Sequence, residues 1–506
     1  MNELTSEMLE KYESLFEERK NRILNAADTV VISGTTYYVS NAGNDKNDGK
    51  TPETAWKTLK KVSEAYLYPG DGVLFKRGDL FRGEVHTKPG VTYAAYGTGV
   101  KPKFYGCDKS LADPALWEEV DSAHHIWRCT EKMLDAGTIV FNEGEAHARK
   151  LIPSYQNMQF VCRDDESRPF VMAEEMTQDL DLFWYYETLL SRRPSKGEDF
   201  PIPELDCDTA LGDLYLRCDK GNPGEVFETV ESVARRHMFI VGTDANVTID
   251  NLCVKYVGMH GVSGQKHVVG LHVTNCEFGW IGGSIQHYCG TDPNYPQGGR
   301  GSVTRFGNAI EIYGGCEDYV AANNYIYQVY DAGITHQITT NEKIIMTGIR
   351  YTGNVIEKCV YGIEYFLDQI DGERESYMED VVMSDNYIRL SGYGWGQQRH
   401  NSHTPALIKG WSYVNTARNY SIHHNIFDRC AYRMLHLVAL KDSYCPEMHD
   451  NTYIQHQDGM LGQYGGNETQ EPAILLYDAQ AEEKITTIFG DKNAKVYTLT
   501  SNENSY

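Results

Sequence analysis

The chain has 506 residues, with 47 Lys and Arg against 71 Asp and Glu, so its net charge is −24. A surface this acidic argues against nucleic acids and anionic membranes as partners. The length exceeds what one simple core needs, which predicts several domains or one elongated repeat domain. Tyr (35) outnumbers Phe (16), and its flat ring with a polar tip suits contact with sugars as well as packing in strands.

The first residues, MNELTSEMLEKYESLFEERKNRIL, are charged throughout and contain no continuous apolar stretch. We therefore expect no signal peptide and a cytoplasmic protein. No run approaches the ~18 apolar residues of a membrane span, so no membrane partner is expected. The 12 Cys lack any CxxC spacing, which predicts buried free thiols, with neither disulfides nor a structural zinc site.

In chain order, the first expected element is an amphipathic helix over residues 3–26, within an N-terminal segment of residues 1–29. Residues 30–106 then read as a cap and first coils: a strand at 37–39, a Gly/Asn/Asp turn cluster, a helix over about 52–65, and alternating strands and turns up to residue 105.

Residues 107–235 interrupt this rhythm. They contain three tryptophans, a charged stretch, a Pro-rich stretch over 193–203, and short alternating strands near 138–141 and 213–217. We interpret this segment as an inserted β-rich domain.

From residue 236 to 460 one sequence pattern recurs: alternating apolar residues, an Asn, and an apolar pair. The anchors are Asn251, Asn275, Asn324, Asn354, Asn386, Asn425 and Asn451, with spacings of 24, 49, 30, 32, 39 and 26 residues, of which 49 is close to two coils. Strand-like repeats of this length predict a β-solenoid. An Asn amide at a fixed corner can bond the backbone and the Asn of neighbouring coils, so these residues are predicted to be structural. Residues 461–506 are expected to cap the open end.

These two patterns resemble the pectate-lyase-like superfamily of right-handed parallel β-helices. The cap resemblance lies in YYVSNAGNDKNDGKTPETAWKTLKKV and PGDGVLFKRGDLFRGEV, and the coil resemblance in the Asn repeats. NAIEIYG, NNYIYQVYDAGIT and GIEYF after an inserted domain are similar to β-helix glycoside hydrolases such as the β-xylosidase and fucosidase families. The resemblance implies an all-β parallel β-helix, but the superfamily also contains lyases, epimerases and noncatalytic proteins, so fold alone does not fix the reaction.

Acidic residues align on one predicted face of the coils. If Ile310, Ile334 and Ile363 point inward, alternation places Glu311, Thr335, Gln337 and Glu364 outward, with Asp331 and Asp368 sharing that face. A glycosidase needs two such carboxylates. Coils lie about 4.8 Å apart. Asp331 and Glu364 on adjacent coils suit the about 5–5.5 Å of a retaining pair, and Glu311 and Glu364, about 9.6 Å apart, approach an inverting pair. We favour Asp331 as nucleophile, Glu364 as acid/base and Glu311 as the orienting residue.

A polar, aromatic loop follows these coils and is predicted to form a wall of the binding site. The predicted substrate-binding residues are Gln337, Asp368, Trp395, His400, His403, Trp411 and His436, and the loop between His287 and Phe306 is a candidate opposite wall. His336 has inward parity and is expected in the core, and His423 and His424, beside an anchor Asn, are expected to be structural.

The favoured function is an exo-acting glycoside hydrolase for short oligosaccharides. One alternative is a polysaccharide lyase or other uronate-acting enzyme, for which Arg399 and Lys409 offer cations without an obvious Ca²⁺ cluster. The other alternative is a noncatalytic carbohydrate-binding solenoid. No cofactor or metal is expected, although Ca²⁺ and a homo-oligomer stay open.

Overall fold

A computed structural model describes most of the chain. The described residues are 2–133, 135–151, 171–176, 183–187, 211–243, 245–289, 302–369, 375–399, 404–411, 417–437, 446–464, 474–477 and 481–499.

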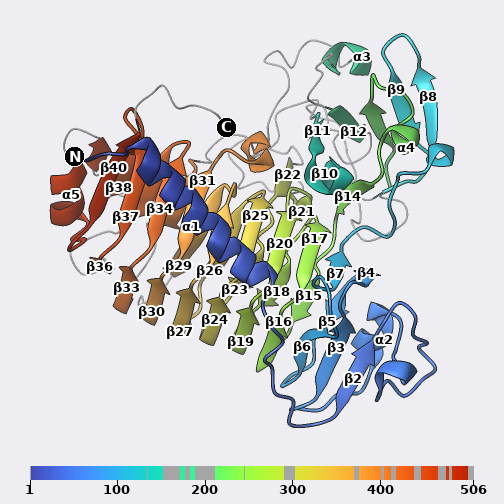
Figure 1. Cartoon of the computed structure of the whole chain (residues 1–506), viewed down its shortest axis with the longest axis horizontal. Coiled ribbons are helices and arrows are strands. Elements are labelled where there is room, and N and C mark those ends of the chain that lie inside the picture. The colour runs from blue at the N-terminus through green and yellow to red at the C-terminus, as the bar shows by residue number, and fades with distance from the viewer. Residues whose placement is uncertain are drawn as a thin grey trace.

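Long parallel sheets run the length of the molecule, and successive coils add a strand to each (Figure 1). Sheet 1 contains β2 (Thr36–Val39), β3 (Gly72–Lys76), β6 (Thr92–Tyr96), β16 (Val247–Asp250), β19 (Val268–Thr274), β24 (Cys316–Ala322), β27 (Ile345–Thr352), β30 (Tyr377–Ser384), β33 (Ala417–His423) and β36 (Glu447–His449).

Sheet 2 follows the Asn corner of each coil. It contains β4 (Leu80–Arg82), β7 (Lys103–Tyr105), β17 (Cys253–Val257), β20 (Glu277–Ile281), β25 (Tyr325–Val329), β28 (Val355–Glu357), β31 (Tyr387–Ser391), β34 (Ile426–Cys430), β37 (Thr452–His456) and β40 (Lys495–Leu499), with β1 (Asn2–Glu3) beside β40.

Sheet 3 completes each coil. It contains β5 (Val85–His86), β15 (Phe239–Val241), β18 (Val262–Gln265), β23 (Ile310–Tyr313), β26 (Ala332–Thr340), β29 (Tyr361–Gln369), β32 (Ala406–Gly410), β35 (Arg433–Leu437), β38 (Met460–Tyr464) and β39 (Ile474–Tyr477), which is antiparallel to β38. One apolar core fills the space between the three sheets. The predicted all-β parallel β-helix is therefore confirmed.

Buried asparagines stack at the corner between sheets 1 and 2. Asn324 donates to Asn354 (3.1 Å), Asn354 to Asn386 (2.9 Å), Asn386 to Asn425 (2.9 Å) and Asn425 to Asn451 (3.0 Å). Each amide also donates to a backbone carbonyl of the preceding coil. The predicted structural role is confirmed for these five residues, because every polar atom buried at this corner needs a partner.

The sequence alignment of the first two anchors was wrong by one residue. In register, Glu277 pairs with Tyr325, so Cys276 stands where Asn324 stands in the next coil. Asn251 and Asn275 instead occupy the preceding position, where φ is 61° and 52°. The left-handed backbone conformation favours Asn, which explains why Asn also occurs at this position. The 49-residue spacing was also misread: β19 pairs directly with β24, so this interval is one coil with a long excursion.

That excursion includes a two-stranded hairpin of β21 (Ile285–Cys289) and β22 (Ser302–Arg305). A second excursion precedes β32 and contains the short helix η5 (Trp395–Gln398). In the N-terminal cap, η1 (Pro52–Thr54) and α2 (Leu59–Glu64) replace the single helix expected over 52–65. Near the C-terminal end lies α5 (Ala481–Ile488).

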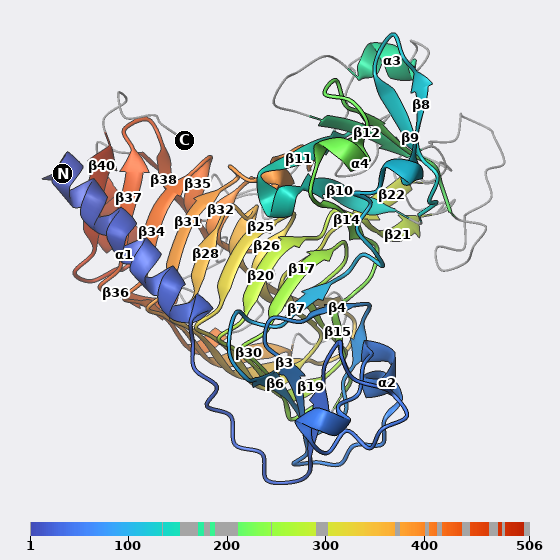
Figure 2. The same ribbon diagram turned by 45° about the vertical axis from the view of Figure 1, so that its right-hand side comes forward.

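A mostly antiparallel unit interrupts the coils and stands above the β17 end of the body (Figures 1 and 2). Its own core includes Trp117, Phe141, Leu214 and Phe227. Its elements are η2 (Pro114–Leu116), β8 (Trp117–Asp121), β9 (Ile126–Cys129), β10 (Ala136–Phe141), η3 (Asn142–Gly144), β11 (Ala146–Lys150), α3 (Met172–Glu175), β12 (Phe183–Glu187), β13 (Leu214–Arg217), α4 (Pro223–Val226) and β14 (Val230–Ala234).

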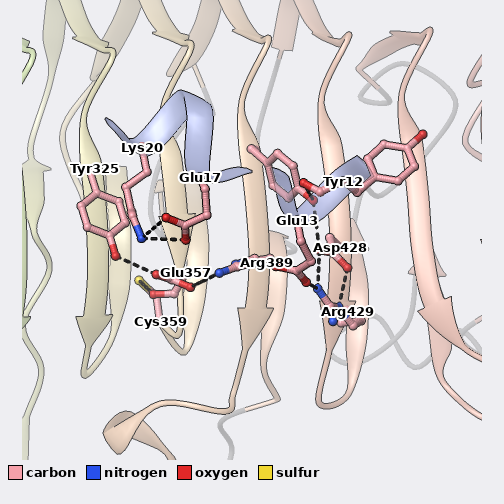
Figure 3. Close-up of polar contacts among 11 residues, drawn as sticks. Tyr12, Glu13, Glu17, Lys20, Tyr325, Glu357, Cys359, Arg389, Asp428 and Arg429 are labelled. Atoms are coloured by element: carbon pink, nitrogen blue, oxygen red, sulfur yellow. Dashed lines mark hydrogen bonds and ion pairs between the residues drawn. The ribbon is translucent and has the colours of Figure 1, made fainter. Parts of the chain in front are cut away.

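The helix α1 (Ser6–Leu24) lies across the outer face of sheet 2 (Figures 1 and 2). The side chain of Thr5 caps its N-terminus by accepting from the backbone N–H of Met8. Phe16 and Ile23 pack on tyrosines and aliphatic side chains of the sheet. Beside this contact, Glu13 accepts from Arg389 and Arg429, both at 2.5 Å (Figure 3). The predicted N-terminal helix is confirmed, and it covers a strip of sheet that would otherwise expose apolar rings.

Eight described cysteines are buried and free, as predicted: Cys107, Cys129, Cys218, Cys253, Cys276, Cys316, Cys359 and Cys430. No helix among the described residues is both long and apolar enough to span a membrane.

Candidate active site

A cavity of about 540 Å³ opens on the outer face of sheet 3. Its floor consists of side chains from β18, β23, β26 and β29, and its walls come from the turns and excursions at their ends. Three acidic residues line it, Glu311, Asp331 and Glu364, together with Arg399. This volume lies in the about 300–1,000 Å³ range of small-molecule pockets.

Strand register builds the floor of the cavity. Ile310, Ile334 and Ile363 are in register and buried in the core, as the alternation predicted. The residues that follow them, Glu311, Thr335 and Glu364, are likewise in register on the outer face. Glu311 and Glu364 are therefore two coils apart, and the coil spacing places their backbones about 9.6 Å from each other.

A second row of the floor lies two residues further along each strand. It contains Gln265, Tyr313, Gln337 and Phe366, which are in register and all line the cavity. The Oε1 atom of Gln337 is buried and has no hydrogen-bond partner among the described residues. The same holds for Nε2 of Gln286, which also lines the cavity. Buried polar atoms without partners are costly, so the cavity suits a polar ligand.

Glu364 has the properties of a proton donor. Only 5% of the residue is exposed, and Oε1 accepts a 2.5 Å hydrogen bond from Nε1 of Trp411. Burial, followed by the charge of Asp331, raises the pKa of Glu364 to about 8. Its carboxyl group is therefore mostly protonated at neutral pH, which is the state that a general acid needs.

Asp331 is paired with a buried arginine. Nη1 of Arg399, a residue just after η5, donates to Oδ1 of Asp331. Burial raises the pKa of Asp331 above its ordinary value, and the charge and hydrogen bond of Arg399 oppose that rise. The guanidinium thus acts in favour of the anionic form of this carboxyl. On Glu364 the hydrogen bond of Trp411 and the charge of Arg399 act in the same direction, against the larger effect of burial.

The position of Asp331 differs from the sequence-based expectation. It lies at the corner just before β26, where its carbonyl accepts from the N–H of Tyr361. The direct neighbour of Glu364 on the adjacent coil is Thr335, not Asp331. Coil spacing alone therefore does not set the distance between Asp331 and Glu364, and their retaining separation stays a prediction. The two carboxyls nevertheless line one cavity, and the charge of Asp331 contributes to the raised pKa of Glu364.

Glu311 is held by a polar cluster that the sequence did not reveal. Its Oε2 accepts from Nδ2 of Asn308 (2.5 Å) and lies 2.8 Å from Nδ1 of His260. Oδ1 of Asn308 in turn accepts from the N–H of Ala332, the residue after Asp331 (2.8 Å). Asn308 thereby ties Glu311 to the corner that carries Asp331. The Asn three residues before Glu311 in NAIEIYG is the one signal that pointed to it.

Several flat side chains complete the walls. Trp411 and Phe366 were within the segments predicted to carry the site, and Phe306 confirms that the hairpin excursion reaches the cavity. The wall also includes His237 and His260, whose rings stack 5.1 Å apart. Aromatic faces beside polar groups are suited to sugar rings, which have apolar faces and polar edges.

Three predicted binding residues lie away from the cavity. Trp395 is buried against Tyr330 and Trp280, and its Nε1 donates to the carbonyl of Gln328 (2.8 Å), so it is a packing residue. His436 is fully buried on β35, beyond Lys409 in the row of Glu364. Asp368, near the end of β29, does not line the cavity. His400 and His403 lie outside the described residues.

His336 is a core residue, as its parity predicted. It is fully buried, its Nδ1 lies 2.9 Å from the hydroxyl of Tyr351, and its ring stacks on Tyr365. Burial lowers the pKa of His336 to about 3, so the ring is neutral at physiological pH.

Comparisons with known proteins give distant likenesses. No family model matches the chain. A stretch of 80 residues is 41% identical to a lacto-N-biosidase of Bifidobacterium longum subsp. longum, which covers 14% of this chain and 5% of that protein. A structure of XylC with xylose is similar over 93% of this chain and 86% of that one (12% identity, TM-score 0.43).

The GH136 lacto-N-biosidase from Eubacterium ramulus is similar over 98% of this chain and 71% of that one (12% identity, TM-score 0.37). A rhamnogalacturonan lyase is similar over 94% of this chain and 89% of that one (11% identity, TM-score 0.29). Because these likenesses are remote, the activity has to be argued from the cavity itself.

Proposed function

We propose that this protein is a glycoside hydrolase that removes terminal sugars from short oligosaccharides. The observation that carries the proposal is a pair of carboxyls that line one cavity in different surroundings. Glu364 is buried with its pKa raised to about 8, while Asp331 is paired with the guanidinium of Arg399. A protonated carboxyl beside a carboxylate that is paired with a cation fits the acid and the nucleophile or base of a glycosidase.

In the proposed mechanism Glu364 donates its proton to the glycosidic oxygen as the bond to the anomeric carbon breaks. The carboxylate of Asp331 attacks the anomeric carbon and forms a glycosyl ester, and the aglycone leaves as an alcohol. Glu364, now ionised, removes a proton from water, which attacks the anomeric carbon and displaces Asp331. Both carboxyls return to their starting states, and the net change is addition of water across the glycosidic bond.

Glu311 has a positioning role in this proposal. Its contacts with His260 and Asn308 fix a charge beside Asp331, and Asn308 holds the corner of Asp331 through Ala332. If Glu311 instead activated water, its two-coil separation from Glu364 would suit inversion, for which carboxyls lie about 6.5–9.5 Å apart. The anomer released first separates the two mechanisms.

The shape of the site supports action on chain ends. The floor and walls form a single cavity of about 540 Å³, and pockets of this size enclose a small ligand on several sides. The local identity to a lacto-N-biosidase agrees with an oligosaccharide as substrate.

The test is hydrolysis of aryl glycosides that differ in sugar and anomer, among them xylosides, fucosides, arabinosides and galactosides. Release of the aryl alcohol by the wild type, and its loss in Glu364→Gln and Asp331→Asn, is the expected result. Asp368→Asn is the matched control, since it removes a carboxyl from the same strand as Glu364 but outside the cavity. NMR of the first-formed anomer then assigns retention or inversion.

Other outcomes contradict the proposal. An unsaturated, ultraviolet-absorbing product from uronate oligomers would identify a lyase. Binding of oligosaccharides without turnover, unaffected by either substitution, would identify a noncatalytic solenoid.

A further inference from the structure

Three imidazoles gather at the Asn corner of the last coils, between sheets 1 and 2, whereas the cavity lies on the outer face of sheet 3. His423 ends β33, His424 follows it, and His449 ends β36 on the next coil, in register with His423. One ligand atom from each ring lies within 4.8 Å of the others. Among the described residues this is the group of His, Cys, Asp and Glu side chains with the spacing of metal ligands.

We propose that His423, His424 and His449 bind a first-row transition-metal dication such as Zn²⁺. Imidazole nitrogen is a favoured ligand of zinc, nickel, cobalt and copper, whereas Ca²⁺ and Mg²⁺ prefer oxygen. The ion joins two neighbouring coils and is separate from the catalytic site, which has its own acids.

The corner itself does not require histidine. In the preceding coils the same two positions before the buried Asn hold Ala322 and Asn323, Thr352 and Gly353, and Ser384 and Asp385. The second residue of each pair has a positive φ, of 53°, 66° and 59° respectively. This position therefore requires only a residue that tolerates the left-handed region. The last two corners hold histidine at three of these four positions, and the backbone conformation does not explain that choice. The three rings also converge on one point, as the ligands of a metal ion do.

The arrangement of the rings suits a shared ion. The rings of His423 and His449 are stacked 4.6 Å apart at 4°, and the ring of His424 stands nearly perpendicular to both (86° and 89°). The Nδ1 atoms of His423 and His424 are 2.9 Å apart. With metal–nitrogen bonds of about 2.0–2.1 Å, tetrahedral ligand atoms lie about 3.3 Å from each other. The ligand atoms of the three rings lie within 4.8 Å of one another at this partly exposed corner, so the proposed ion requires only a limited rearrangement of the rings.

An acidic side chain stands beside the rings. Oδ2 of Asp450 lies 2.8 Å from Nδ1 of His449 and 3.9 Å from Nε2 of His424. A carboxylate here is placed either to complete the coordination shell or to orient a ligating ring, as outer-shell carboxylates do. Asp450 has the left-handed backbone conformation of the corner, with φ of 58°. This backbone conformation sets the position of its Cβ atom relative to the three rings.

The experiment is calorimetric titration of Zn²⁺ into protein freed of metal with EDTA and exchanged into chelator-free buffer. The expected result is one high-affinity ion per chain, and a higher melting temperature with Zn²⁺ than with EDTA. His449→Ala and, separately, His424→Asn are expected to weaken binding by at least about 100-fold, because even outer-shell partners of a metal are worth about 10- to 100-fold. His424→Asn preserves a residue that tolerates a positive φ, so it tests the ligand without changing the backbone.

The matched control is the double variant His267→Ala/His272→Ala. His272 lies on β19 and His267 directly precedes that strand, but each has one acidic partner at 3.0 Å, Asp318 and Glu317 respectively. Wild-type stoichiometry and melting shift in this control, with both lost in the cluster variants, support the proposal. Absence of a one-to-one ion in the wild type, or equal binding in the cluster variants, overturns it. Neither result bears on the glycosidase proposal, whose readout is sugar release.

Discussion

The hydrogen bond from Trp411 to Glu364 provides a sharp test of the proposed acid. Trp411 donates Nε1–H to Oε1 at 2.5 Å, and a donor to a carboxylate stabilises its charged form. This contact therefore lowers the pKa of Glu364, against the larger effect of burial that raises it to about 8. Trp411→Phe keeps an aromatic ring in the wall and removes the donor, so the pKa of Glu364 should rise further.

The magnitude follows from the strength of such bonds. A hydrogen bond to a charged group contributes about 1.5–3 kcal/mol, and one pKa unit corresponds to about 1.36 kcal/mol. The alkaline limb of kcat/KM, which reports the acid in the free enzyme, should therefore move from about pH 8 in the wild type upward by about 1 to 2 pH units. Its height should fall as well if Trp411 stacks on the sugar, but height and position are read separately.

The assay is a kcat/KM profile on the best aryl glycoside found for the wild type. Trp395→Phe is the control, since it removes a comparable indole hydrogen bond, to Gln328, outside the cavity. An alkaline limb that stays in place or moves down in Trp411→Phe would refute the assignment of Glu364 as the acid. Movement of the limb in Trp395→Phe would show that the shift is not local.

Three further predictions concern stability. Glu364→Gln should raise the melting temperature at neutral pH. The pKa of Glu364 in the folded state, about 8, lies above its ordinary value of 4.5, so the native state holds a proton that the unfolded state loses, and the stability of the wild type falls as pH rises from about 4.5 to 8. A variant no more stable than the wild type at pH 8 contradicts this. Asn386→Ala should cost about 3 kcal/mol or more by chemical denaturation, because it leaves Asn354 and Asn425 with unpaired buried atoms, whereas Asn21→Ala on the exposed side of α1 should be nearly neutral. Glu13→Gln should cost only about 1 kcal/mol, since Glu13 is partly exposed and both arginines keep a second acidic partner, Glu357 for Arg389 and Asp428 for Arg429 (Figure 3); a loss of several kcal/mol would mean that the helix depends on this one contact.

Alternation predicted the regular part of the molecule well. The inward row of Ile310, Ile334 and Ile363 and the outward row of Glu311 and Glu364 follow directly from the period of two in a strand. The Asn ladder was also readable, because a buried corner amide recurs for a physical reason. The ladder was misaligned at Asn275, because the small buried Cys276 fills the corner position. Asn275 itself adopts a positive φ and donates to Oδ1 of Asp250 (2.8 Å).

The irregular part of the site was less accessible to the same reasoning. Parity assigns a residue to a face of the sheet but does not reveal what covers that face, so His436 was expected in the cavity and is buried. Trp395 lies in an excursion whose path no periodicity describes. Asp331 was placed on a strand, whereas it occupies the corner that precedes one.

The regular coils and the irregular corners and excursions contribute different groups to the site. The coils place Glu364 on a rigid floor, where neighbouring positions are set by strand spacing and cannot be adjusted individually. The corners and excursions bring Asp331 and Arg399 to that floor from outside the repeat. The excursion that carries Arg399 lies between β31 and β32, so its length and sequence can change without altering the stacking of the coils. The state of Asp331, and through it the pKa of Glu364, therefore depends on a part of the chain that the fold leaves free to vary.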